Sequence, residues 1–101
     1  VSLGKVKNAF VKNNYGDIRI EEVNNKMEIE SDCGDVKIGT IMLLEDSSII
    51  NNFGDIKIGK TNEIYMDAKT DLGDVKINHN YRHSETILKI ENNCGNIKVE
   101  N

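Results

Sequence analysis

A phrase of about nine residues recurs five times in this chain of 101 residues. Each copy holds an apolar residue, a glycine, an aspartate or asparagine, and then two β-branched residues separated by a basic one, as in FGDIKI. The glycines are Gly16, Gly34, Gly54, Gly73 and Gly95, which places successive copies 18 to 22 residues apart. A period of this length is typical of solenoids, in which each copy is a structural unit that stacks on its neighbours.

Apolar columns alternate with polar columns when the copies are aligned on their glycines. The second and fourth residues after each glycine are Ile or Val in all five copies, as at Ile56 and Ile58. Alternation of β-branched residues with a period of two predicts strands. The residue before each glycine is also apolar and continues the alternation, so we expect it to face the core. These residues are Tyr15, Cys33, Phe53, Leu72 and Cys94.

The glycine lies where the alternation slips by one residue. Such a slip fits a corner at which one residue takes a left-handed conformation, which glycine adopts without steric cost. The Asx residue that follows each glycine suits a turn, because its side chain can hydrogen-bond the local backbone. The third residue before each glycine is small and polar, and we expect it to face inward and to bond along the stack. This column is Asn13, Ser31, Asn51, Thr70 and Asn92.

These features predict an all-β fold, a single-domain parallel β-solenoid of the β-helix or β-roll kind with about five coils. The domain is expected to span residues 1–101 and to be a piece of a longer protein. Residues 1–12 hold Gly4 only 12 positions before Gly16, and we interpret them as a partial or capping coil. The coils are expected to stack in the order of the sequence, because each must lie on its neighbour.

Composition argues against two classes of partner. The net charge is −4, whereas nucleic-acid binding needs an excess of Lys and Arg on one face. No apolar run approaches the roughly 20 residues of a membrane-spanning helix, so no membrane insertion by this chain is expected. The longest run is Ile41–Leu44, and alternation buries either Ile41 and Leu43 or Met42 and Leu44. The outward pair either packs beneath a neighbouring spacer or forms a contact site for a partner.

Two charged columns raise the question of a metal. Aspartate follows four of the five glycines, and a stack of carboxylates about 4.8 Å apart could belong to a calcium-stabilised β-roll. A basic column from Arg19 to Lys98 lies two positions further along each copy and offsets the repulsion. Calcium-binding β-rolls carry a Gly- and Asp-rich phrase twice per coil, whereas this chain carries one Gly-Asp per coil. We therefore expect neither a metal nor another cofactor.

Other reactive residues form no catalytic pattern. Cys33 and Cys94 share a column three coils apart in sequence order, and about 14 Å exceeds the reach of a disulfide, so we expect buried free thiols. His79 and His83 lie four apart in a predicted loop, without the helix and glutamate of a zinc protease. A polysaccharide-acting β-helix enzyme would need paired acids in a groove walled by long loops, and the spacers here are short. We expect no enzymatic activity.

The phrases YGDIRI, CGDVKI, FGDIKI, LGDVKI and CGNIKV resemble the bacterial adhesin-like family called Toastrack, and the resemblance covers nearly the whole chain. Members usually carry serine before the glycine, where this chain has Tyr, Cys, Phe, Leu or Cys. The resemblance implies a β-solenoid in the bacterial envelope, often attached to membrane-anchored or envelope-stress signalling proteins, and it implies no catalytic residues.

The expected function is that of a non-catalytic interaction or scaffold module in a bacterial cell-envelope or surface protein, with an extracytoplasmic location. The expected partner is a protein or a surface glycan, and the open coil ends add an expectation of end-to-end self-association. A calcium-stabilised β-roll is the alternative, and a fragment of a polysaccharide-acting enzyme is less favoured. The residues assigned to partner contact come from the apolar run and from the longest spacer, 78–86: Met42, Leu44, Tyr81, Arg82 and His83.

Overall fold

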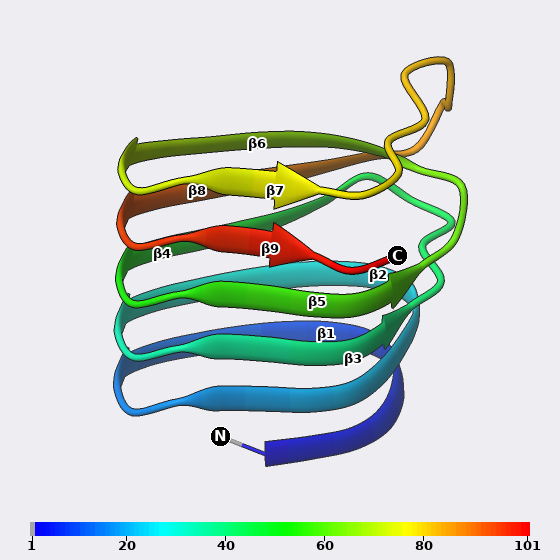
Figure 1. Cartoon of the computed structure of the whole chain (residues 1–101). Helices are drawn as coiled ribbons and strands as arrows, with labels where there is room; N and C mark the ends of the chain where they lie inside the picture. The colour runs from blue at the N-terminus through cyan, green and yellow to red at the C-terminus, as the bar shows by residue number, and fades with distance from the viewer. Residues whose placement is uncertain (1) are drawn as a thin grey trace.

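The computed structural model of the protein describes residues 2–101, which form nine strands and no helix (Figure 1). All strand pairings are parallel. The predicted parallel β-solenoid of about five coils is confirmed. The strands are β1 (Ser2–Tyr15), β2 (Ile18–Cys33), β3 (Val36–Ile41), β4 (Ser47–Phe53), β5 (Ile56–Thr61), β6 (Tyr65–Leu72), β7 (Val75–Ile77), β8 (Ile87–Cys94) and β9 (Ile97–Val99).

The strands form two stacks that face each other across the core (Figure 1). β1 and β2 bend and take part in both stacks, because the first part of β2 pairs with β3 and its second part pairs with β4. The β3 stack continues through β5, β9 and β7, and the β4 stack continues through β8 and β6. A corner glycine joins each strand of the β4 stack to the next strand of the β3 stack, so each coil is named here by its glycine. The β1 end is called the bottom of the stack, as it is drawn in Figure 1.

The last two coils do not stack in the order of the sequence. β8 lies between β4 and β6, and β9 lies between β5 and β7, so the Gly95 coil is inserted between the Gly54 and Gly73 coils. The predicted sequential stacking was wrong at this point. The strands stay parallel while the chain steps back by one level, so the connection from β7 to β8 has the opposite hand to the earlier ones.

Burial explains why the last coil lies inside the stack. An interior coil is covered on both sides, and the Gly95 coil supplies four fully buried apolar side chains: Leu88, Ile90, Ile97 and Val99. The Gly73 coil is less suited to the interior, because it has the small Ala68 in the column of Ile90. As the end coil it leaves Val75 42% exposed. Placing the more apolar coil inside removes more apolar surface from water, and spacer 78–86 provides the chain length for the return.

The core lies between the two stacks and consists of the inward columns of each coil. The predicted apolar columns two and four residues after the glycine are buried in the Gly16, Gly34, Gly54 and Gly95 coils. The Gly73 coil at the open top is the exception, with Val75 exposed and Ile77 half-buried. Gly4 does not belong to the corner glycines. β1 pairs with β2 in a register that places Gly4 beside Glu21, in the column of Gly39 and Gly59.

The corner glycines confirm the predicted left-handed conformation, with φ between +103° and +147°. At three of the four contacts between neighbouring corners of the described residues, four hydrogen bonds, called here the corner bonds, join one corner to the next. Between the Gly54 and Gly95 coils they run from Gly54 N to Cys94 O (3.0 Å), from Ile56 N to Asn96 O (2.9 Å), from Asn96 N to Asp55 Oδ1 (2.9 Å) and from Asn92 Nδ2 to Gly54 O (2.9 Å). These bonds explain why the phrase recurs. Its glycine, the Asx residue after the glycine and the small polar residue three positions before it each donate to or accept from the neighbouring coil.

Asparagine side chains extend the pairing where strands end. Asn62 donates from Nδ2 to the Leu43 carbonyl (2.8 Å) and accepts at Oδ1 from the Leu43 N–H (3.1 Å). Asn80, in spacer 78–86, makes the same two bonds with the backbone of Met66 on β6, at 3.0 and 2.8 Å. The spacer therefore caps one part of the top coil, on the side away from the glycine corners (Figure 1).

Candidate functional site

An apolar column runs along the outside of the glycine corners. The prediction that the residue before each glycine faces the core was wrong, because Tyr15 is 80% exposed, Phe53 54% and Leu72 69%. The inner side of each corner is filled instead by the small polar column, in which Asn51 and Asn92 are buried as predicted. We call the exposed column the corner stripe. From bottom to top it is Tyr15, Cys33, Phe53, Cys94 and Leu72.

Large and small side chains alternate along the corner stripe. Tyr15, Phe53 and Leu72 occupy every second level, and a cysteine occupies each level between them. With a strand spacing of about 4.8 Å, the large side chains are about 10 Å apart. This period exists only because the Gly95 coil lies beneath the Gly73 coil; in sequence order the column reads Tyr, Cys, Phe, Leu, Cys.

The two cysteines of the corner stripe are free and half-buried. Each pairs in register with Phe53, so they are two levels apart and not three. Two levels correspond to about 10 Å, still beyond the roughly 7 Å limit of a disulfide. The prediction of free thiols is confirmed, and the prediction that they are buried was wrong because their column faces outward.

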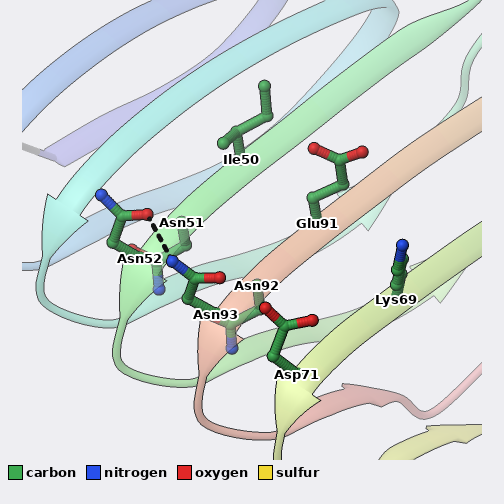
Figure 2. A pocket seen from close by; sticks show the side chains of 8 residues that line it. All are labelled: Ile50, Asn51, Asn52, Lys69, Asp71, Glu91, Asn92 and Asn93. Atoms are coloured by element: carbon green, nitrogen blue, oxygen red, sulfur yellow. Dashed lines mark hydrogen bonds between the residues drawn. The ribbon is translucent and has the colours of Figure 1, made fainter.

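A row of Asx residues borders the corner stripe on the outer surface of the β4 stack. The Asn52 amide donates to Asp32 Oδ1 (2.6 Å), and the Asn93 amide donates to Asn52 Oδ1 (3.3 Å). Figure 2 shows three residues of this row, Asn52, Asn93 and Asp71, beside a hollow of about 200 Å³, which Ile50 and Glu91 help to line. Amides and carboxylates together offer donors and acceptors to a polar ligand. We call this the Asx row; its members are Asn14, Asp32, Asn52, Asn93 and Asp71.

The aspartates that follow the glycines serve as connections between coils. Oδ1 of Asp17, Asp35 and Asp55 each accepts the backbone N–H of the Asx residue one level above, at 3.0, 2.9 and 2.9 Å. Within residues 2–101, no group of three or more His, Cys, Asp or Glu side chains is arranged to hold a metal ion. The basic column lies in register on the β3 stack, at Arg19, Lys37, Lys57, Lys98 and Lys76.

Glu100 is the acidic partner of two of these bases. Its Oε1 lies 3.2 Å from Lys98 Nζ and 3.7 Å from Lys57 Nζ. The hydrogen bond from Lys98, helped by the positive charges of Lys57 and Lys98, lowers the pKa of Glu100 below its ordinary value of 4.5.

We expect Glu100 to stabilise the fold slightly at neutral pH. Because its folded-state pKa is lowered, the contribution is present above the unfolded-state pKa and is lost as pH falls through the folded-state pKa. The effect is small, since the carboxylate is exposed to solvent. An NMR pH titration of the Glu100 carboxyl carbon should give a midpoint below 4.5, and Lys98→Gln should raise it. A midpoint that does not move in the Lys98 variant would contradict this assignment.

The residues assigned to partner contact lie in two separate places. Met42 and Leu44 are exposed and Ile41 and Leu43 are buried, so one of the two expected arrangements of the apolar run is observed. The loop residues of spacer 78–86 line an open hollow of about 610 Å³, in which Met42 and Leu44 take no part. Binding by either group stays a prediction. The hollow is lined by Glu63, Asn80, Tyr81, Arg82, His83 and Ser84.

Sequence reasoning missed the corner stripe, and side-chain size would not have found it. Its column contains Tyr, Cys, Phe and Leu, whereas the inward columns that follow the glycine contain only Ile and Val. However, the column seven residues before each glycine also varies in size and is buried: Ala9, Met27, Ser47, Leu88 and Met66. The usable signal is the position directly before the glycine at which the alternation slips, because a bulge or corner re-aims the side chain.

Comparison with known proteins identifies one matching family. Residues 2–101 contain no helix of the length and apolarity needed to cross a membrane. The family model described as Toastrack DUF4097 matches residues 1–101. The comparisons with curated proteins and with solved structures gave no match.

Proposed function

The chain belongs to the Toastrack DUF4097 family, and from this premise we propose that it is a non-catalytic interaction module of a bacterial cell-envelope protein. We propose further that its partner is a linear surface glycan that lies along the corner stripe. The observation that carries the proposal is the placement of Tyr15, Phe53 and Leu72 on alternate levels of one exposed edge.

The chemistry of the edge suits a sugar polymer. The C–H faces of sugar rings pack on aromatic and aliphatic side chains, and their hydroxyls need both donors and acceptors. The corner stripe supplies the apolar surface and the Asx row beside it supplies amides and carboxylates. The spacing of about 10 Å between large side chains suits the disaccharide repeat of an extended β-1,4-linked glycan. Alternate rings would then lie on Tyr15 and Phe53, with the ring between them over Cys33.

The distribution of acidic groups supports a role in binding. Glycoside hydrolysis needs two carboxyl groups that converge on one bond. In residues 2–101 an aspartate follows the glycine at four of the five levels, and Oδ1 of Asp17, Asp35 and Asp55 is engaged by a backbone N–H group of the neighbouring coil. An envelope location agrees with this reading, because a module outside the cytoplasm meets surface glycans directly.

We expect the domain to bind a soluble β-1,4-linked N-acetylglucosamine hexamer at its corner edge. Titration followed by 1H–15N NMR should shift amide signals at the corner stripe and the Asx row. Tyr15→Ala and Phe53→Ala should each weaken binding by about two- to tenfold, as expected for loss of one stacking contact worth ~0.5–1.5 kcal/mol. The disaccharide should bind more weakly than the hexamer, because it cannot span two large side chains.

The control is a double substitution, Met42→Ser with Leu44→Ser, which removes the other exposed apolar pair. Binding of the hexamer should be unchanged in this variant. Equal loss in the control and in the corner-stripe variants would contradict the proposal, as would shifts confined to spacer 78–86. The latter result would favour the loop hollow as the contact site.

A further inference from the structure

The bottom of the stack differs from the rest in its corner bonds. In the three upper coils, the small polar residue of each coil donates to the glycine carbonyl of the coil beneath. Asn51 donates to Gly34 O (3.2 Å), and Thr70 donates to Gly95 O (3.0 Å). Asn92 does the same with the Gly54 carbonyl, as described above. The small polar side chain of each of these coils therefore uses a glycine carbonyl of the coil below as its hydrogen-bond acceptor.

The bottom coil departs from this pattern of hydrogen bonds. Within residues 2–101 no coil lies beneath Asn13, and its Nδ2 donates instead to Gly16 O of its own coil at 2.9 Å. That carbonyl is the one that Ser31 would use by analogy with Asn51. Ser31 Oγ is consequently buried with no hydrogen-bond partner among the described residues, a costly arrangement for a hydroxyl. A glycine carbonyl placed beneath Asn13 would restore both bonds.

The top coil presents such a glycine. Among the described residues, β6 and β7 each have a strand partner on one side only, and Gly73 forms the corner between them. The apolar side chains of this coil are correspondingly open, with Leu72 and Val75 exposed. All strands run parallel, so a second copy shifted along the stack axis would meet this edge with its own β1 in the same direction and register.

The charges of the two ends are complementary. β1 carries Lys5, Lys7 and Lys12 and no acidic residue. The top coil, residues 62–78, carries four acidic residues against two lysines: Glu63, Asp67, Asp71 and Asp74 against Lys69 and Lys76. Opposite net charges favour top-to-bottom contact and disfavour contact between two like ends.

We propose that the top coil binds the β1 edge of a second copy of this chain, giving head-to-tail rods. Such a contact is heterologous and need not close, so rods can lengthen by further copies. Asn13 of the upper copy would donate to the Gly73 carbonyl of the lower copy, and Ser31 of the upper copy would regain the Gly16 carbonyl. The corner stripe would continue unbroken from Leu72 to the next Tyr15.

Spacer 78–86 competes with this contact. Asn80 holds the Met66 backbone, which is the position that Ala9 of the second copy would pair with, since Ala9 and Met66 share a column. Tyr81 N also donates to Ile64 O at 3.3 Å. Loosening the cap should therefore strengthen association, and full pairing requires the spacer to swing away from β6.

Sedimentation equilibrium over a range of protein concentrations tests the proposal. The wild type should show a mass that rises with concentration, and the rise should weaken with added salt. Asp67→Lys with Asp71→Lys, at the top, should lower the association constant about tenfold or more. Lys5→Glu with Lys12→Glu, at the bottom, should do the same, and an equimolar mixture of the two variants should recover association. Asn80→Ala should raise the constant.

The control reverses two charges in the middle of the stack, Lys37→Glu with Lys60→Glu on β3 and β5, and should associate like the wild type. Circular dichroism shows which variants are folded, and Asn80→Ala keeps the test informative if a charge variant does not fold. A single monomer mass for both the wild type and Asn80→Ala at all concentrations would overturn the proposal. So would a loss of association in the mid-stack control as large as that in the end variants.

Discussion

Replacing Gly54 with alanine is expected to lower the free energy of unfolding by ~4 kcal/mol. Gly54 has φ +123°, a conformation that alanine rarely adopts. An added Cβ would also overlap the carbonyl oxygen of Gly34. That oxygen belongs to backbone held by the corner bonds, so relief requires the Gly34 and Gly54 coils to separate.

Gly16→Ala is the matched control for this prediction. Gly16 has φ +103°, but the nearest atom to an added Cβ is Asn13 Nδ2, at 3.9 Å. Only the conformational strain remains, about 1–2 kcal/mol. Urea denaturation followed by far-UV circular dichroism measures both variants against the wild type. Equal losses in the two variants would show that the close approach of neighbouring corners contributes nothing to stability.

Val99→Ala is expected to cost about 2–3 kcal/mol, and Val75→Ala less than about 1 kcal/mol. The two substitutions remove the same atoms. Val99 is 1% exposed in the inserted Gly95 coil, whereas Val75 is 42% exposed in the Gly73 coil at the top. A buried methyl group loses its packing when deleted and leaves a cavity, while an exposed one gives up little.

This pair of variants tests the order of the coils directly. A stack in sequence order would place the Gly95 coil at the open end, and Val75 would then be the costly position. Thermal denaturation and urea denaturation both give the comparison, with Ile97→Ala as a second probe of the inserted coil, since Ile97 is fully buried. Stability losses in the reverse order would rule out the insertion.

Much of the local structure was predictable from the repeat. The glycine corners, the strand on either side of them and the inward Ile and Val columns follow from periods of two and of about twenty, and the structure confirms them. The small polar column was predictable too, because Asn51 and Asn92 occupy inward positions by the same alternation. These features depend on residues that are close together within one copy of the phrase, and the sequence contains five copies.

The candidate site was less predictable. Phe53 follows the inward Asn51 by two residues, so alternation alone placed it inside, and the structure places it outside because the chain has begun to turn at the corner. Met42 and Leu44 were one of the two outward pairs that alternation allowed, whereas Tyr15 and Leu72 were assigned to the core. A turn changes the direction of side chains, and strand periodicity does not describe turns.

By itself, the sequence determined that this chain forms a parallel β-solenoid with glycine corners, since only glycine tolerates both the positive φ and the approach of the next corner. Only the tertiary structure decided the order in which the coils stack. Backbone corner bonds of the same kind join all neighbouring coils, so local pairing accepts any order of stacking. The total apolar surface removed from water distinguishes the orders, and it favours the Gly95 coil inside and the Gly73 coil at the end. That choice also sets the alternation of the corner stripe and the charge of the exposed top.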